Sequence, residues 1–294
     1  MPARISIVIP NLDSPWIDRT LAALRLQNAP SPEREVLVIG RDTPGLVPRD
    51  TALRFLESRA QLNPAQARNR GVAESSGTWV LFVDADCAPH PGWIDGLSAA
   101  LETAPVAGGA VTFDLGADRW SLADNIASFH ELLPDRPAER DTRRPLGSLN
   151  LGLQRDAWTR VGPFDEGLPT SEDFDWILRA RAVGLATAFV PAARVEHLPA
   201  RPDRAALLAH ARWYGQHFNE FRQKYPGLLD DGPTWRSRRR LALATEAKSW
   251  LAAVGIFRRH TSLLGSLRAL PGVVAFKRAW YRAILETWPT GVSR

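Results

Sequence analysis

Two acidic side chains follow a strongly apolar run in the first third of the chain. Asp84 and Asp86 flank Ala85 directly after residues 78–83 (TWVLFV). Such a run predicts a buried strand, and open α/β sheets bind their ligands beyond the carboxyl ends of strands. Residues at i and i+2 of an extended chain project to one side, so these carboxylates can hold a hard divalent cation that in turn holds phosphate oxygens. Taken alone, the pair also fits an ordinary acidic turn.

A second group of acids opens a predicted helix. Glu172 and Asp173 precede the apolar-periodic residues 174–183, and Asp175 lies within the first turn. Acidic side chains at a helix N-terminus cap its free N–H groups and interact favourably with the helix dipole. That structural role suffices for one of these acids and leaves another available for chemistry.

Alternating elements must position these acids. Short apolar runs predict strands, and apolar residues at helical spacing predict helices between these strands. Asn63 followed by Pro64 predicts the start of one helix. This alternation is typical of right-handed βαβ units and a largely parallel sheet in an α/β fold. The expected strands are residues 5–9, 35–39, 78–83, 106–113 and 187–190, with order resuming at 149–153. The expected helices are residues 15–28, 63–75, 88–104, 174–183 and a helical region from about Asp203, with a helix and then a mobile loop in 115–147.

Composition limits the class of protein. The chain has 294 residues, of which 45% are hydrophobic and 23% charged, enough for a large α/β domain with an appendage. The single Cys87 excludes a disulfide framework and is expected to be a small packed residue rather than a nucleophile. No secretory signal and no apolar stretch of membrane-spanning length is seen. We therefore expect a cytoplasmic protein, soluble or peripheral on the inner face of the membrane.

Charge is distributed unevenly. From Gly232 onward there are 12 Lys/Arg and 2 Asp/Glu, whereas the rest of the chain has 25 basic and 30 acidic residues. Residues 237–288 read as two or three amphipathic helices with two apolar stripes. Packing on the catalytic domain and docking on an anionic membrane surface are both compatible with this basic tail. Nucleic acid is not expected as a partner, because the body is acidic and no nucleic-acid-binding motif is present. The stripes are Leu243, Ala247, Trp250, Leu251 and Val254, and Val273, Phe276, Trp280, Ile284 and Trp288.

Several segments together resemble one enzyme family. Family 2 glycosyltransferases of the GT-A fold have an Asn-x-x-x-x-Arg-Asn-x-Gly helix before a strand that ends in an acidic metal motif, and residues 63–87 (NPAQARNRGVAESSGTWVLFVDADC) are similar. Residues 5–10 (ISIVIP) resemble the first nucleotide-binding strand of the family. Residues 148–184 resemble its acceptor and catalytic segment, and residues 195–199 (VEHLP) follow in the same order. The resemblance covers about residues 4–225.

The resemblance implies a metal and diphosphate site. Asp84, Ala85 and Asp86 match the acidic motif. The resemblance implies that Asp84 and Asp86 bind the metal and that Asp84 and Ala85 also contact the nucleotide-sugar. His197 matches a late histidine that completes the metal shell in many GT-A enzymes. The implied cofactor is a divalent metal, Mn²⁺ or Mg²⁺, which neutralises the charge developing on a departing diphosphate.

It also implies the reacting and donor-binding residues. Asp173 matches the general base of an inverting transfer, and Glu172 and Asp175 are the implied acceptor contacts. Pro10 and Asn11 lie where the family holds the nucleoside, and Arg68 matches a basic residue near the nucleotide. Where the family usually has Asp-Asp-Gly-Ser, this chain has Gly40-Arg41-Asp42-Thr43. Asp42 is the implied substitute, and Arg41 is the alternative, as a contact to a phosphate or to a different base. Uridine, guanosine and thymidine stay open as donor bases.

The expected function follows from this resemblance. It is transfer of a hexose from a nucleoside-diphosphate sugar to a hydroxyl of a glycan or a lipid-linked, cell-envelope acceptor in polysaccharide biosynthesis. A sugar nucleotidyltransferase and a non-catalytic binding module of the same fold are the alternatives. The first would need a Gly-rich, basic loop after the first strand, which PNLDSPW lacks. The expected domains are a catalytic domain of residues 1–229, with a nucleotide-sugar half to about 113 and an acceptor half from 114, and a helical tail of residues 230–294.

Overall fold

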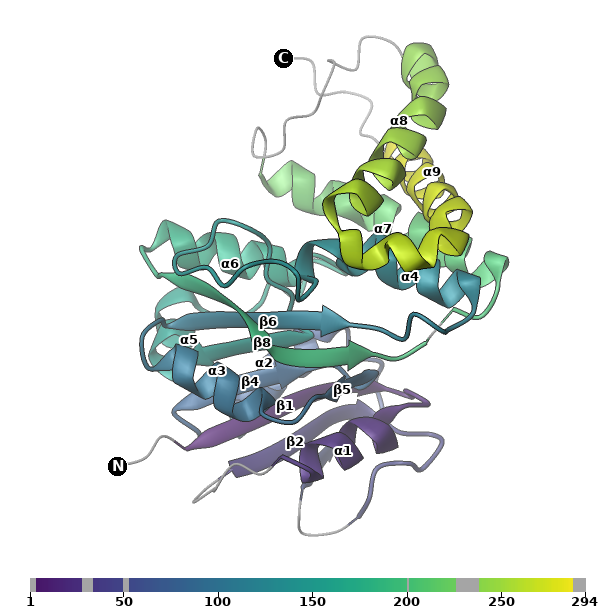
Figure 1. The fold of residues 1–294 in the computed structure, drawn as a ribbon. Helices are drawn as coiled ribbons and strands as arrows, with labels where there is room; N and C mark the ends of the chain where they lie inside the picture. Colours follow the sequence, from purple (N-terminus) through teal and green to yellow (C-terminus); the bar gives the residue numbers. More distant parts are fainter. Residues whose placement is uncertain (1–3, 28–33, 50–52, 200, 226–237, 288–294) are drawn as a thin grey trace. The chain divides into compact units, whose positions relative to one another are not determined.

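The computed structural model describes residues 4–27, 34–49, 53–199, 201–225 and 238–287 (Figure 1). Its strands are β1 (Ile5–Leu12), β2 (Arg34–Arg41), β3 (Arg54–Glu57), β4 (Trp79–Val83), β5 (Cys87–Pro89), β6 (Val106–Thr112), β7 (Asn150–Gln154) and β8 (Thr187–His197). Its helices are α1 (Ile17–Arg25), α2 (Pro64–Glu74), α3 (Trp93–Leu101), α4 (Arg119–Phe129), η1 (His130–Leu132), α5 (Arg155–Val161), α6 (Glu172–Ala182), α7 (Arg204–Lys224), α8 (Arg238–Arg259), η2 (Thr261–Ala269) and α9 (Leu270–Glu286).

The described strands form one mixed sheet in the order β3-β2-β1-β4-β7-β6-β8-β5. β3, β2, β1 and β4 are mutually parallel, and β6 pairs with β8 in parallel. β7 runs antiparallel between β4 and β6, and β5 runs antiparallel to β8. Four of the seven pairings are therefore parallel, which confirms the predicted α/β class with a mostly parallel sheet and a C-terminal helical extension.

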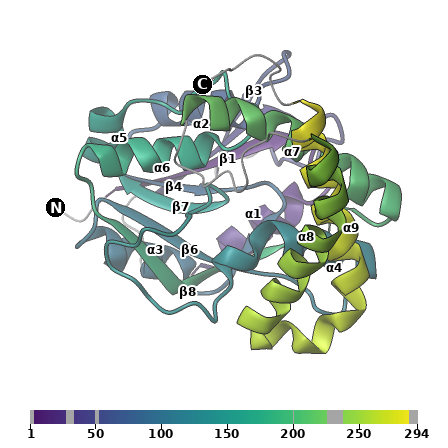
Figure 2. The same cartoon turned by 90° about the horizontal axis from the view of Figure 1, so that it is seen from above.

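Helices cover both faces of this sheet. α2, α5 and α6 lie on one face, and α1 and α3 lie on the other (Figure 2). The strands alternate accordingly: Val8 and Phe82 belong to the core cluster under α2 and α6, where Trp176 is fully buried. The predicted start of α2 is confirmed, because Asn63 and Gln66 form a capping box and Pro64 is the first helical residue.

The sheet extends further than the sequence predicted. β3 and β5 were not expected, and β8 does not end before Pro191 but runs on to His197. The register between β6 and β8 jumps from Gly109↔Val190 to Ala110↔Arg194, so β8 carries a bulge at Pro191. Pro is tolerated at a bulge because its missing N–H is not needed there. A Cβ at Gly109 would lie 2.1 Å from Ala193 O, so only glycine admits this close approach.

The chain divides into two compact units. One comprises Met1–Thr112 and Glu131–Leu198, and the other comprises Phe113–His130 and Pro199–Arg294. The first contains the whole sheet. The expected domain boundary near residue 229 lies outside the described residues, and α7 belongs to the same unit as α8 and α9.

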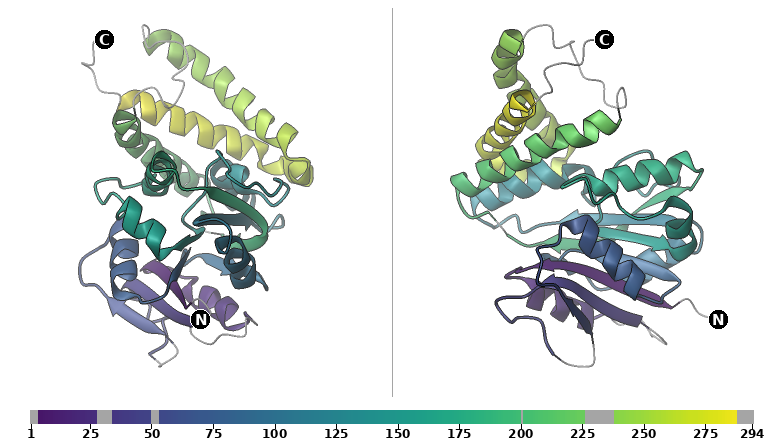
Figure 3. Two further views of the ribbon diagram at one scale, coloured as in Figure 1. Left: turned by 90° about the vertical axis from the view of Figure 1, so that its left-hand side faces the viewer. Right: turned by 180° about the vertical axis from the view of Figure 1, so that it is seen from behind.

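The second unit is a set of packed helices. α9 contacts α4, α7, α8 and η2, and α8 and α9 lie side by side (Figure 3). Gly215 of α7 permits close packing, since a Cβ there would lie 2.5 Å from Trp280 O of α9. The expected apolar stripe on α9 faces inward, with Val273, Phe276 and Ile284 buried. Its last member, Trp288, lies outside the described residues.

Candidate active site

One end of the sheet gathers the predicted acids. β1 and β4 are parallel, so their carboxyl ends meet at the same edge, where Asp84 follows Val83. The antiparallel β7 brings its first residue, Asn150, opposite Val83. β8 and β5 are the last two strands in the order of the sheet, and Cys87 of β5 pairs with His197 of β8. Segments more than 60 residues apart in sequence therefore converge on this edge because of the mixed strand order.

Arg68 joins the acidic motif to helix α6. Its Nη2 donates to Asp84 Oδ1 at 2.6 Å, and its Nη1 donates to Glu172 Oε1 at 2.6 Å. The Arg68 side chain is only 3% exposed and that of Glu172 only 7%. The guanidinium is thus a buried cation between two carboxylates rather than a surface group on α2. Charge-assisted bonds of this kind fix geometry as well as adding energy.

The site holds more negative than positive charge. Among the described residues, the charges of Asp84, Glu172 and Asp173 act on the Arg68 guanidinium, and the charge of Asp86 acts on Asp84. Burial and the neighbouring Asp173 charge raise the pKa of Glu172 to about 7, against the pull of Arg68. Burial also raises the pKa of Asp84, and the Asp86 charge adds to it while Arg68 opposes it. An excess of clustered carboxylates is relieved by binding a cation, so the electrostatics suit a divalent metal.

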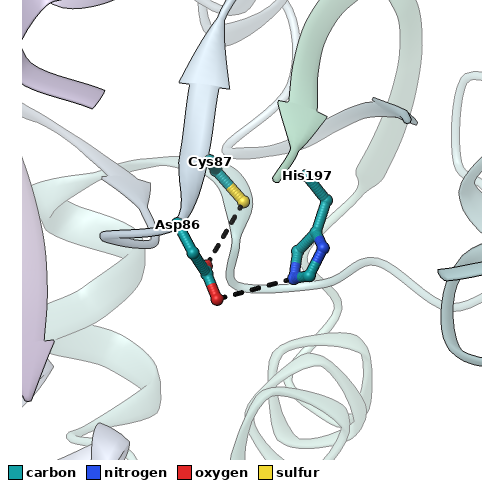
Figure 4. Close-up of side chains that lie close together, drawn as sticks. All are labelled: Asp86, Cys87 and His197. Atoms are coloured by element: carbon teal, nitrogen blue, oxygen red, sulfur yellow. Dashed lines mark hydrogen bonds and ion pairs between the residues drawn. The ribbon is translucent and has the colours of Figure 1, made fainter. Parts of the chain in front are cut away.

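Asp86 and His197 lie together beside this pair. Asp86 Oδ2 is 3.6 Å from His197 Nε2, and the Cys87 thiol lies 3.8 Å from Asp86 Oδ1 (Figure 4). One ligand atom from each of these three residues lies within 4.8 Å of the others. A carboxylate oxygen and an imidazole nitrogen are suitable ligands for Mn²⁺. Among the described residues, the expected ligands Asp86 and His197 therefore meet. Asp84 lies outside this group of three, and its Oδ1 accepts a hydrogen bond from Arg68.

Backbone contacts hold the acidic motif in place. The carbonyl oxygen of Ala85 accepts hydrogen bonds from Ser14 Oγ at 2.9 Å and Thr20 Oγ1 at 3.1 Å. Leu198 N donates to Asp86 O at 2.8 Å, just after β8. The motif is consequently clamped between the β1–α1 connection and the end of β8. Ala85 itself is 5% exposed.

Asp173 is half-buried at the first turn of α6. Its Oδ2 accepts from Ser148 N at 3.0 Å and from Ser148 Oγ at 3.3 Å, and its Oδ1 accepts from Phe174 N at 2.8 Å. Ser171, directly before the helix, has φ of 65°, a left-handed conformation that is uncommon outside glycine. Strained residues of this kind concentrate at functional sites. The turn places Glu172 against Arg68 while Asp173 faces Ser148.

The other two acids expected at the acceptor are not exposed. Glu172 is 6% exposed, and Asp175 has no exposed surface at all. Asp175 Oδ2 accepts from Arg179 Nε at 2.8 Å, and Arg179 also donates to Val161 O. The described contacts of Asp175 are those of local structure, which ties α6 to the segment after α5.

The ends of β1 and β2 supply the expected nucleoside region. Asn11 is buried, and its Nδ2 donates to Arg41 O at 2.8 Å, while Pro10 precedes it in β1. Both carboxylate oxygens of Asp42 accept backbone N–H bonds, from Leu46 at 3.1 Å and Val47 at 2.8 Å. Asp42 therefore shapes the loop that follows β2.

Sequence reasoning missed Asp13 and Ser148, and it did not assign Cys87 to the site. Asp13 pairs with Arg41 Nε at 2.6 Å and has φ of 54°, and its hydrogen bond from Thr43 N is the main cause of its lowered pKa. Ser148 orients Asp173, and Cys87 lies in the Asp86–His197 group. Cys87 is buried, as predicted, and burial raises the pKa of its thiol. The adjacency of Cys87 to Asp86 was a visible signal, whereas no local pattern marks Asp13 or Ser148.

Comparisons with known proteins agree on one family. The family model described as Glycosyl transferase family 2 matches residues 6–166, more than half of the chain. Glycosyltransferase AglE from Haloferax volcanii is 29% identical over 210 residues, which are 67% of each chain.

Solved structures share the fold. The mannosyltransferase PcManGT from Pyrobaculum calidifontis, in complex with GDP-Man and Mn²⁺, has a TM-score of 0.57 at 16% identity, covering 93% of this chain and 86% of that one. S. aureus TarS has a TM-score of 0.51 at 14% identity, covering 97% and 91%. GalNAc-T7 with UDP, GalNAc and Mn²⁺ has a TM-score of 0.52 at 14% identity, covering 85% and 52%. These similarities confirm the expected GT-A fold.

Proposed function

Because the chain belongs to glycosyl transferase family 2, we propose that it is an inverting, metal-dependent hexosyltransferase. Glycosyl transfer from a nucleotide-sugar donor is the activity that the family match and the similar proteins support. Inversion, the metal and the acceptor are the additional parts of the proposal.

The observation that carries the proposal is the Arg68 bridge. It connects Asp84 of the acidic motif to Glu172, the residue before Asp173. A diphosphate held at the acidic motif and an acceptor held near the α6 N-terminus would thus share one rigid frame. Holding two reactants in fixed orientation removes much of the entropic barrier to their reaction.

In the proposed reaction Asp173 is the general base. Its carboxylate takes the proton of the acceptor hydroxyl as that oxygen attacks C1 of the donor sugar. The new C1–O bond forms as the C1–O bond to the diphosphate breaks, and its electron pair leaves with the diphosphate. A single displacement of this kind inverts C1 and forms no sugar–enzyme bond. Ser148 donates to the carboxylate and keeps it oriented.

The proposed metal ligands are Asp86, His197 and Asp84. Their carboxylate and imidazole donors suit Mn²⁺ or Mg²⁺, and the two similar structures above that contain a nucleotide or nucleotide-sugar also contain Mn²⁺. When bound, the cation neutralises charge on the departing diphosphate.

The donor nucleoside is proposed to lie at Pro10, Asn11 and Asp42, beside Arg68. We add Asp13 to these residues. Its partner Arg41, the alternative contact named from the sequence, has a side chain that is 40% exposed and able to meet a base or phosphate. The similar structures contain GDP-Man or UDP, so the identity of the base is left to the experiment.

The acceptor is proposed to be a hydroxyl of a glycan or lipid-linked glycan of the cell envelope. A lipid-linked acceptor would require the enzyme to work as a peripheral protein at an anionic membrane surface. The basic composition of the C-terminal region supports this part of the proposal.

A thermal-shift panel tests the donor and the metal. UDP, GDP and dTDP are each added with and without Mn²⁺ or Mg²⁺. At 100 times its Kd a ligand stabilises the native state by about 2.7 kcal/mol, so one diphosphate should raise the Tm most, and more with metal than without. Absence of any shift with every pair would reject the proposed donor site.

Turnover separates the alternatives. Release of nucleoside diphosphate in the presence of acceptor supports glycosyl transfer. Pyrophosphate release from a nucleoside triphosphate and a sugar phosphate would instead indicate a nucleotidyltransferase, and nucleotide binding without either product would indicate a binding module.

A further inference from the structure

Helix α8 buries an unusual face. The side chains that it turns toward the interior of its unit include Thr245, Ser249, Ala253 and Ile256, all at 2% exposure or less. Their spacing of four, four and three residues defines one helical stripe. Ser249 Oγ donates to Thr245 O within that stripe, and α8 packs on α9 and η2. The buried side chains of α8 are thus small or polar at Thr245, Ser249 and Ala253, and they are large and apolar only at Ile256 and Phe257 near its end.

The most apolar stripe of α8 points to solvent. Trp250 is 43% exposed, Leu251 75% and Val254 38%, and the exposed Ala247 and Arg258 continue the same face. The neighbouring α9 differs, because Val273, Val274, Phe276 and Ile284 are buried there. A helix normally turns its apolar stripe to the core. α8 instead leaves a tryptophan, a leucine and a valine uncovered.

Positive charge borders this stripe. Lys248 and Arg259 are exposed beside this face, Arg258 lies at its end, and the exposed Glu246 nearby is paired with Arg278. The following η2 leaves Leu264 52% and Leu267 51% exposed. The region from Gly232 onward carries 12 basic and 2 acidic residues. An apolar face with Lys and Arg beside it is complementary to a bilayer surface, which has an apolar acyl-chain region beneath anionic headgroups.

We infer that the exposed face of α8, formed by Ala247, Trp250, Leu251, Val254 and Arg258, binds the surface of a bilayer that contains anionic lipid. Tryptophan and leucine settle at the boundary of headgroups and acyl chains, while Lys and Arg meet the phosphates. In the described part of the chain no helix is long and apolar enough to cross a membrane, so α8 would lie in the interface plane. A second copy of the chain is a poorer occupant, because it would bring two strongly basic surfaces together.

This inference rests on the proposed function only for its purpose, which is to bring the active site to a lipid-linked acceptor. The binding itself needs neither donor nor metal. If this inference is wrong, vesicle binding fails while nucleotide binding and transfer to a water-soluble acceptor succeed. If the proposed function is wrong, vesicle binding succeeds while nucleotide binding and transfer fail.

The test is co-sedimentation of the full chain with vesicles of phosphatidylcholine alone and with about one third phosphatidylglycerol, at low and high salt. We expect binding to the anionic vesicles and at least about tenfold weaker binding to neutral ones. Leu251→Glu should weaken binding to anionic vesicles by about tenfold or more, since it removes buried apolar area and adds repulsion. Leu26→Glu is the matched control, because Leu26 is 70% exposed in the other unit.

Arg258→Gln should weaken binding about fivefold, whereas Arg59→Gln, at an exposed site of the other unit, should not change it. Far-UV circular dichroism and nucleotide binding check that each variant is folded. If the Leu251→Glu variant bound anionic vesicles as tightly as the wild type, the inference would be overturned. It would also be overturned if the wild type bound no vesicles and instead formed a dimer in analytical ultracentrifugation that Leu251→Glu dissociates.

Discussion

Arg68 Nη1 lies 2.6 Å from Glu172 Oε1, although 104 residues separate the two in sequence. The pair is almost fully buried, and the other amino group of the same guanidinium binds Asp84. A buried ion pair costs desolvation, and removing one partner exposes that cost in full. The connection between Asp84 and Glu172 thus depends on one arginine.

Arg68→Ala should therefore destabilise the protein by about 3–5 kcal/mol, because it leaves the Glu172 carboxyl buried without its cation. Urea unfolding in the absence of metal measures the change. Arg70→Ala is the control on the same helix, since Arg70 is exposed, and it should stay within about 0.5 kcal/mol of the wild type. Glu172→Gln should restore part of the loss in the Arg68→Ala background, and a loss identical in both backgrounds would show that the two residues are not coupled.

The pKa of Glu172, raised to about 7 from an ordinary value of 4.5, makes stability depend on pH. Between these two values the folded chain binds more protons than the unfolded chain, so this contribution is complete below pH 4.5 and is lost as the pH rises through 7. Its full size is on the order of 1–3 kcal/mol. Unfolding of wild type and Glu172→Gln from pH 4.5 to 8 without metal should show the stability difference, wild type minus variant, falling with pH. A flat difference would mean that Glu172 does not titrate in this window.

Asp173→Asn should keep nucleotide binding and lower the transfer rate by about 10²–10⁴-fold, the usual contribution of a general base. Transfer is followed by release of nucleoside diphosphate, and binding by thermal shift. Asp156→Asn on the exposed surface of α5 should leave both unchanged. Near-normal turnover by Asp173→Asn would assign the base to another group.

Asp86→Ala and His197→Ala should each weaken Mn²⁺ binding by at least about tenfold, because each removes a proposed ligand. The free Mn²⁺ signal in electron paramagnetic resonance reports binding directly. His217→Ala, on α7 of the other unit, is the control and should bind Mn²⁺ like the wild type. A chelator should likewise cancel the extra Tm given by metal in the presence of nucleotide. Unchanged Mn²⁺ binding by both ligand variants would place the metal elsewhere.

Local patterns predicted most of the elements but not how they pair. β1, β2, β4 and β6 could be predicted because each contains a run of consecutive apolar residues that are buried in the sheet. β3 and β5 were not, since four and three residues are too few to show a period. The antiparallel direction of β7 and the passage of β8 beyond Pro191 depend on partner strands that are distant in sequence.

The same limit applies to the site. Asp84 and Asp86 were identified by their position after an apolar run, whereas the roles of Asp173 and His197 came from a resemblance. The mixed strand order brings the segments that carry Asp84, Asp86 and His197 to one end of the sheet. The bridge made by Arg68 could not be predicted, because its partners Asp84 and Glu172 lie 16 and 104 residues away along the chain. On α8 the periodicity predicted the stripe of Ala247, Trp250, Leu251 and Val254, but not that it faces solvent, because that depends on which stripe α9 covers. The first predicted member of this stripe, Leu243, has a side chain that lies outside the described residues.

The span of the Arg68 bridge has a consequence for folding. A nascent or partly unfolded chain that lacks α6 has only Asp84 to offer the arginine, so the acidic edge cannot reach its final form until residues far downstream have docked. Donor capture and global cooperativity are thereby tied together: heating or denaturant should abolish nucleotide affinity in the same transition that melts the sheet, with no intermediate that still holds the donor.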